Sequence, residues 1–241
     1  MLPPPTAARR HGAVALSAVA LLIASLYIGW LGLSGASASW EADVLLALRQ
    51  PGDHAVGLGP AGTARAFRLV SVFGSYLWLA ATAAATAIFL AATGRRRLAL
   101  GVVCAVASAI VTVAALKLLA ARPRPDVVPR LGGFSGASFP SSHAMLSMAV
   151  YGILAVVLTT SRAARHTACI AAVAFSLVIG FSRLYLAVHW PTDVLAGWCL
   201  GAAWALGFAW IAGAALARGS PVATGGPAGT RRDHAPPRGR G

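Results

Sequence analysis

Three short groups of polar and ionisable residues lie at the ends of strongly apolar segments. They occupy residues 117–125, 140–143 and 182–193. Ionisable side chains at membrane depth are energetically costly, and they indicate a functional site by default. Together the groups offer several cations, two histidines and one carboxylate. These are the residue types that bind a phosphate and move protons around it.

The first group contains Lys117 and Arg124, which are seven residues apart. This separation is about two helical turns, so a continuing helix would place both cations on one face. Pro123 and Pro125 loosen the helix and let the second cation turn inward. The alternative is a set of cations that end a span and extend to the interface. We expect that role for Arg122 and Arg130, but not for Lys117, which lies inside the apolar run.

The second group is Pro140-Ser141-Ser142-His143. Pro and Ser are typical of a helix start, whose free N–H groups and positive dipole suit a phosphate. The two serines add hydroxyl groups, and His143 in the first turn could transfer a proton. A plain helix cap beside an incidental histidine would give the same pattern.

The third group begins with Ser182-Arg183 and ends with His189 and Asp193, on either side of Pro191. A carboxylate can fix the tautomer of an imidazole and stabilise the imidazolium. Asp193 also lies in the first turn of the next helix, where negative charge is favoured. A capping aspartate beside an interfacial histidine is the structural alternative.

The composition shows what kind of protein must position these residues. Of the 241 residues, 58% are hydrophobic and 11% are charged, and the mean hydropathy is +0.73. Soluble domains carry about 25% charged residues. The chain is therefore not a soluble enzyme, a disordered regulator or a disulfide-rich secreted module. The net charge of +14 would suit nucleic acid, but the basic residues lie between apolar segments, so we expect no nucleic-acid partner.

The hydropathy pattern predicts an all-α polytopic membrane protein. A span needs about 20 apolar residues, and six segments qualify: 12–33, 70–93, 98–120, 142–160, 167–188 and 193–217. The first segment could alternatively be a cleaved signal peptide. We expect one membrane domain over 12–217, a cytoplasmic N-terminus over 1–11 and a disordered basic tail over 218–241.

The connection over 34–68 is predicted to contain a short helix lying in the membrane interface. Its apolar face would be formed by Trp40, Val44, Ala47 and Leu48, with Glu41 and Arg49 elsewhere on the helix.

Loop charge predicts the orientation in the cell membrane. Arg9 and Arg10 precede the first span, and Arg95–Arg97 form a short basic loop. The positive-inside rule places both in the cytoplasm, together with the C-terminal tail. The alternation of spans then brings all three polar groups to the outer face.

These residues resemble the signature of the type 2 phosphatidic acid phosphatase (PAP2) superfamily, K-x6-RP, PSGH and SR-x5-H-x3-D. The first and third parts match in full, as Lys117-x6-Arg124-Pro125 and Ser182-Arg183-x5-His189-x3-Asp193. The second part departs at Ser142, where the family usually has Gly. A Ser at a helix start needs no positive φ, so we expect activity to survive.

The resemblance implies a role for each matching residue. His189 would be the nucleophile that forms a phosphohistidine, Asp193 would orient it, and His143 would protonate the leaving group and then activate water. The phosphoryl oxygens would be held by Lys117, Arg124, Arg183, Ser141 and the backbone N–H of Ser142. The family's members need no metal, and we expect no cofactor.

The resemblance also implies the substrate class, because an outer-edge site between helices can take a headgroup while the lipid tail stays in the bilayer. We expect hydrolysis of a phosphomonoester or diphosphate of a membrane lipid, of the phosphatidic acid, phosphatidylglycerophosphate or polyprenyl diphosphate type. The alternatives are a lipid phosphotransferase with the same intermediate and a non-catalytic lipid-phosphate binder or transporter. The sequence leaves the oligomeric state open.

Overall fold

The protein is described from a computed structural model, which places residues 7–133 and 135–218. The tail expected to be disordered lies, beyond Arg218, outside these residues. Within the described part, helices predominate and the strands form a single small hairpin. The helices that correspond to the six expected spans are α1 (Ala7–Leu33), the pair α3 (Thr63–Val72) and α4 (Tyr76–Ala92), α5 (Arg96–Ala120), α6 (Ser142–Val157), α7 (Arg162–Tyr185) and α8 (Pro191–Arg218).

The helix lengths refine the number of membrane spans. Four helices, α1, α5, α7 and α8, are each long and apolar enough to cross a membrane. The pair α3 and α4 meets the same test only when taken together, and the two helices are bent by 41°. Helix α6 is apolar but has 16 residues, fewer than the ~20 that a span needs. By length and composition the described residues thus supply four spans, or five if the bent pair counts as one, so the expected count of six is not confirmed.

The bend between α3 and α4 falls at Gly74 and Ser75, within the segment predicted as one span over 70–93. Gly–Ser pairs are common sites of helix kinks. The Ser75 hydroxyl caps α4 by accepting a hydrogen bond from the Trp78 N–H at 3.3 Å. Gly74 packs tightly, because a Cβ at this position would lie 2.5 Å from Ile179 Cγ2 and 3.0 Å from His143 Cδ2. The interruption therefore lies directly against one of the predicted catalytic histidines.

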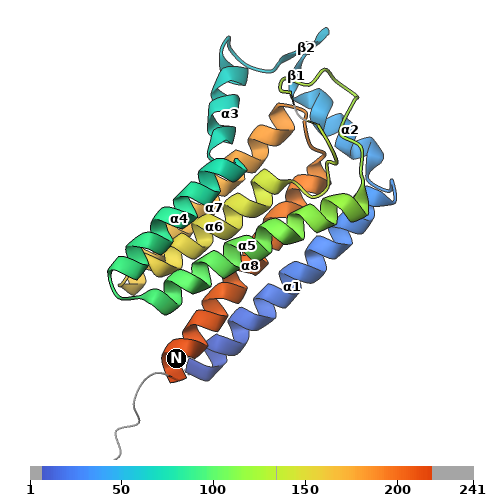
Figure 1. The fold of residues 1–241 in the computed structure, drawn as a ribbon. Helices are drawn as coiled ribbons and strands as arrows, with labels where there is room; N and C mark the ends of the chain where they lie inside the picture. Colours follow the sequence, from blue (N-terminus) through green and yellow to red (C-terminus); the bar gives the residue numbers. More distant parts are fainter. Residues whose placement is uncertain (1–6, 134, 219–241) are drawn as a thin grey trace, which may run out of the picture.

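The helices form a bundle around α6 (Figure 1). Helix α6 packs against both α7 and α8, α1 runs along α8, and α4 packs on α5. Short elements gather at one end of the bundle, namely α2 (Ala38–Ala47), β1 (Arg49–Gln50), β2 (Asp53–Gly57) and α3. The connections α4–α5 and α6–α7 lie at the other end. Arg95 and Arg162 are therefore far from the cap formed by the short elements.

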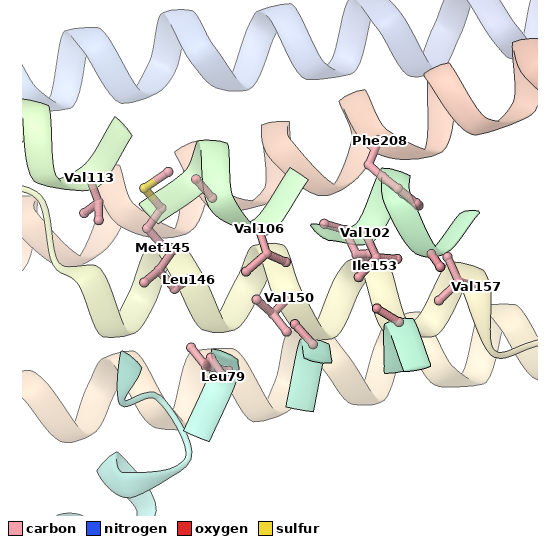
Figure 2. Close-up of a cluster of buried hydrophobic side chains, with 14 of the residues drawn as sticks. Leu79, Val102, Val106, Val113, Met145, Leu146, Val150, Ile153, Val157 and Phe208 are labelled. Atoms are coloured by element: carbon pink, nitrogen blue, oxygen red, sulfur yellow. The ribbon is translucent and has the colours of Figure 1, made fainter. Parts of the chain in front are cut away.

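The core of the bundle is apolar along the length of α6 (Figure 2). Met145, Val150 and Ile153 are buried between side chains of α4, α5 and α8. Between membrane-spanning helices such side chains stabilise the bundle by close van der Waals packing rather than by removal from water. The core fixes α6, and hence the position of the residues at the N-terminus of α6.

A glycine on α8 allows α6 to come close. A Cβ on Gly201 would overlap the backbone oxygen of Met145 and lie 2.8 Å from Met148 Cβ. We expect Gly201→Ala to lower the free energy of unfolding by about 1–3 kcal/mol, because helix backbones must separate. Gly207→Ala on the same helix is the control, since no heavy atom lies within 4 Å of its Cβ position. It should be neutral or stabilising by up to about 1 kcal/mol. Denaturant unfolding in detergent micelles measures both, and equal effects would contradict the packing argument.

Helix α2 confirms the expected short helix in the connection over 34–68, but its buried face is not the predicted one. The buried residues are Glu41 and Leu45, whereas Trp40 of the expected apolar face is 40% exposed. Glu41 is buried because it has buried polar partners, which are described below. The antiparallel hairpin β1–β2 follows α2, and Arg49 Nη1 of β1 donates a hydrogen bond to the backbone oxygen of Tyr185 at 2.9 Å. The cap is thereby fixed to the end of α7.

Candidate active site

A cavity of about 520 Å³ opens at the capped end of the bundle. Six of the eight residues predicted for the site line it: Lys117, Arg124, Ser142, His143, Arg183 and His189. They come from α5, the connection after α5, α6, α7 and the turn before α8. The structure therefore brings together the three groups that the sequence separates.

The other two predicted residues, Ser141 and Asp193, lie behind the cavity wall and are fully buried. Ser141 is the N-cap residue of α6, as expected from its type, but its hydroxyl makes no capping bond. Its backbone N–H donates to the backbone oxygen of Asp193 at 3.0 Å. This bond joins the start of α6 to the start of α8.

His189 stands in the turn between α7 and α8. Ala187 in this turn has a φ of +52°, so the chain reverses within a few residues. The Nε2 atom lies 3.4 Å from Arg124 Nη1, and Nδ1 lies 3.5 Å from Asp193 Oδ2. The second distance exceeds that of a well-formed hydrogen bond, and such contacts often tighten only when substrate binds.

Burial lowers the pKa of His189 from 6.5 to about 4, although the neighbouring Asp193 opposes this change. A lowered pKa means that the folded protein favours the neutral imidazole. The ring therefore stays neutral at neutral pH and becomes protonated only as the pH falls towards about 4. A nitrogen nucleophile needs this neutral form.

Asp193 is held by two donors besides its contact with His189. Its Oδ2 atom accepts a hydrogen bond from the Trp190 N–H at 2.9 Å, and Oδ1 accepts one from Arg122 Nη1 at 2.7 Å. The carboxylate is therefore fixed in orientation before any substrate binds.

Lys117 and Arg124 approach the cavity from different backbone conformations. Helix α5 ends at Ala120, and Ala121 follows with a φ of +44°, so the helix does not continue to Arg124. Arg124 lies in the non-helical connection, where its Nη1 atom donates to the Val188 oxygen at 2.6 Å. Lys117 Nζ donates to the Ala137 oxygen at 2.8 Å. The prolines thus turn the second cation inward, as expected, by ending the helix.

Arg183 is the third cation, in the last turn of α7. Its side chain is fully buried and lines the cavity. Ser142 is the first residue of α6, and the non-glycine residues with positive φ in the described part are Ala121 and Ala187. The backbone at Ser142 thus needs no glycine, as predicted.

Arg122 corrects the sequence-based expectation. We expected it to reach the interface as a span-ending cation, but its side chain is 9% exposed and bridges two carboxylates, Glu41 and Asp193. The prediction was wrong because the second carboxylate comes from α2, which is distant in sequence. Sequence reasoning also missed Ser71, Ser75 and Tyr76, which line the cavity from the break between α3 and α4. The pair Gly74-Ser75 was the available signal for that break.

The residues around the cavity suit an anion. Its charged donors are a lysine and two arginines, and the described residues bring together no group of three or more His, Cys, Asp or Glu side chains that could hold a metal ion. The cavity also holds two histidines, one of them beside a buried carboxylate, and its cations can stabilise the charge on the oxygens of a phosphate.

The comparisons with known proteins bear on the family to which the chain belongs. The sequence profile of the PAP2 superfamily matches residues 98–216. Over 142 residues the chain is 35% identical to decaprenylphosphoryl-5-phosphoribose phosphatase of Mycolicibacterium smegmatis, covering 58% of this chain and 73% of that protein. The chain belongs to the PAP2 superfamily, as the signature residues indicated.

Two further relatives match over shorter stretches. Phosphatidylglycerophosphatase B of Bacillus subtilis is 41% identical over 85 residues, which are 33% of this chain and 41% of that protein. Undecaprenyl-diphosphatase of Sulfolobus acidocaldarius is 38% identical over 65 residues, 27% and 29% of the two chains. The match therefore spans less than half of either relative.

Two solved structures share the fold. The transmembrane PAP2 type phosphatidylglycerolphosphate phosphatase from Bacillus subtilis superposes with a TM-score of 0.68 at 24% identity, covering 81% of this chain and 96% of that one. Aquifex aeolicus LpxE gives a TM-score of 0.50 at 22% identity, covering 70% and 92%. The fold of the described residues is thus that of a transmembrane PAP2 protein.

Proposed function

We propose that the protein is a metal-independent lipid phosphatase that acts through a phosphohistidine on His189. One observation carries the proposal. His189 Nε2 lies beside Arg124 at the cavity, while Nδ1 faces the buried carboxylate of Asp193. The nitrogen available for attack is thus next to a phosphate-binding cation, and the other nitrogen has a partner for the charge that develops.

In the first step, Nε2 attacks the phosphorus atom of the bound phosphate. The N–P bond forms while the bond from phosphorus to the leaving oxygen breaks. His143 enters this step protonated and gives its proton to that oxygen, while Asp193 stabilises the charged ring of His189. Lys117, Arg124 and Arg183 surround the equatorial oxygens, whose charge must be stabilised in the transition state.

In the second step, water attacks the phosphorus of the phosphohistidine, and His143 accepts a proton from this water. The N–P bond breaks, inorganic phosphate forms, and His189 returns to its neutral state. His143 therefore serves as acid and then as base, so the proton balance closes over one cycle.

The substrate proposed is a phosphomonoester or diphosphate of a membrane lipid. The cavity lies at the end of a bundle of membrane-spanning helices, and Val72 and Tyr76 from the α3–α4 break add apolar surface to its wall. The three relatives are named for lipid-linked phosphates of different kinds. The phosphate group is the shared chemistry, so we propose the class of substrate rather than one lipid.

Phosphate release from a short-chain lipid phosphate tests this function. The purified protein in detergent should release inorganic phosphate at an unchanged rate in excess EDTA. A phosphotransferase would release little phosphate until an alcohol acceptor is added, and a binding protein would release none. Loss of activity in EDTA that returns with a divalent metal would contradict metal independence.

We further propose that the cavity faces the outside of the cell membrane. The basic loop at Arg95–Arg97 and the arginines that begin α7 lie at the end of the bundle opposite the cap, and the positive-inside rule favours the cytoplasm for that end. The cations of the cavity lie at the other end because they bind phosphate.

Cysteine labelling measures this sidedness. In a chain whose native Cys104, Cys169 and Cys199 are replaced by Ala, we expect Asp126→Cys to react with an impermeant maleimide on intact cells. Asp126 is exposed in the connection between α5 and α6. Thr160→Cys, exposed between α6 and α7, should react only after the membrane is opened. The reverse pattern would place the cavity in the cytoplasm.

A further inference from the structure

A buried ion-pair network lies behind the nucleophile. Arg122 donates from Nη1 to Asp193 Oδ1 and from Nη2 to Glu41 Oε2, both at 2.7 Å. The exposed fractions of the three side chains are 9% for Arg122, 0% for Asp193 and 1% for Glu41. The network thus connects α2, the segment after α5 and the first turn of α8, and it is almost entirely shielded from solvent.

Glu41 is oriented as firmly as Asp193. Its Oε2 atom also accepts a hydrogen bond from the Ser37 hydroxyl at 2.7 Å. Its Oε1 atom accepts from the Thr192 N–H at 3.1 Å and from the Thr192 hydroxyl. Buried ion pairs of this kind are weak evidence for stability, since desolvation offsets their attraction. A role in function is therefore the better explanation for burying two carboxylates and one guanidinium.

The geometry suggests what Glu41 does. A guanidinium facing a lone carboxylate prefers to bind both of its oxygens. If Arg122 bound Asp193 in this way, it would occupy Oδ2, the atom that faces His189 Nδ1. Glu41 instead engages the Nη2 group of Arg122, so that Asp193 gives only Oδ1 to the guanidinium. Oδ2 then remains directed at Trp190 N–H and at the imidazole.

We propose that Glu41 and Arg122 are positioning residues of the active site, which hold Asp193 so that its Oδ2 atom backs the nucleophile His189. This inference rests on the proposed function. It makes α2, a helix of the cap, part of the support of the active site. Neither residue touches the cavity, so both act through Asp193.

The charges around His189 give this role a measurable signature. The charges that act on the ring come from Asp193 of α8, Arg124 of the connection after α5 and Arg183 of α7. His143 of α6 interacts with the ring as well, and Lys117 of α5 lines the same cavity. When the negative charge of Glu41 is removed, the positive charge of Arg122 is balanced by Asp193 alone. Arg122 then interacts more strongly with Asp193, and Asp193 stabilises a protonated His189 less. Removing the positive charge of Arg122 has the opposite effect on Asp193. The two changes should therefore move the protonation of His189 in opposite directions.

The experiment compares Glu41→Gln, Arg122→Gln and the double variant with the parent. We expect each single change to lower kcat by about tenfold to a hundredfold, with KM altered less than about threefold. The apparent pKa of His189 should fall by about 1 in Glu41→Gln, rise by about 1 in Arg122→Gln and return towards the parent value in the double variant. It is measured from the pH dependence of diethylpyrocarbonate modification at His189, followed by peptide mass spectrometry.

The control is Asp43→Asn, which removes a carboxylate from an exposed position of the same helix and should leave both readouts unchanged. If the glutamine variants do not fold, Arg122→Lys is the second test. It keeps the buried positive charge but lacks the planar set of guanidinium donors that binds two carboxylates at once. The positioning role predicts a lower kcat for folded Arg122→Lys. Parent-like kcat in every folded variant, or pKa shifts of the same sign in both glutamine variants, would overturn the proposal. If the parent releases no phosphate, the proposed function fails, while the modification readout still tests the positioning.

Discussion

We expect His189→Ala to lower phosphate release by roughly 10⁴-fold or more while the protein stays folded in the membrane. The alanine has no nitrogen to form the covalent bond to phosphorus, and the remaining cations can only hold the substrate. Release is measured with a short-chain lipid phosphate, and folding by thermal unfolding in detergent. His166→Ala is the matched control, because His166 is exposed near the start of α7, at the far end of the bundle. It should keep the parent rate.

The parent protein should also carry a trappable phosphohistidine. A radiolabelled lipid phosphate mixed with the enzyme and quenched in alkali, where the N–P bond survives, should label the peptide that contains His189. His189→Ala should show no label. More than a few per cent of the parent rate in His189→Ala, or a label on another residue, would contradict the assignment of the nucleophile.

The second large effect is expected at Arg183. Arg183→Gln should lower kcat by about a hundredfold to a thousandfold, because a buried donor aimed at developing charge is worth far more than one in water. Its side chain is fully buried at the cavity, so solvent cannot replace it. Steady-state kinetics on the lipid phosphate measures the change.

Arg165→Gln supplies the control for charge, since Arg165 lies in the first turn of the same helix and is exposed. It should leave kcat unchanged. Arg183→Lys keeps the charge without the planar fork, and it should fall between the parent and Arg183→Gln. Equal rates in Arg183→Gln and the parent would remove Arg183 from the phosphate-binding set.

The residues around the cavity could be found from sequence because they violate a simple physical rule. Lys117 and Arg183 are cations within apolar runs, where desolvation is costly, and the alternation of spans predicts that they meet at one side. The six helical segments were likewise readable from hydropathy. His143 could be predicted as a site residue because it follows a helix-start motif, and His189 because it lies just before the break at Pro191.

The residues that hold Asp193 in place could not be predicted from the sequence in the same way. Glu41 looked like the polar side of an interfacial helix, because its partners Arg122 and Thr192 are 81 and 151 residues away in the chain. The periodicity of a helix predicts which residues share a face. It does not predict which face is buried when a polar residue such as Glu41 has buried hydrogen-bond partners. The break at Gly74-Ser75 was hidden for a related reason, since the apolar run continues through it.

The chain order of the helices has a consequence for biosynthesis. Helix α8 supplies Asp193 and packs along α1 and α6. The Ser25 hydroxyl of α1 donates a hydrogen bond to the backbone oxygen of Ala196 in α8 at 3.0 Å. A protein is synthesised from its N-terminus onwards, so α1 is made long before α8 supplies the partner of Ser25. A nascent chain interrupted before Pro191 would carry His143 and the cavity cations without a backed nucleophile. Insertion of α8 is therefore the step that completes the support of His189.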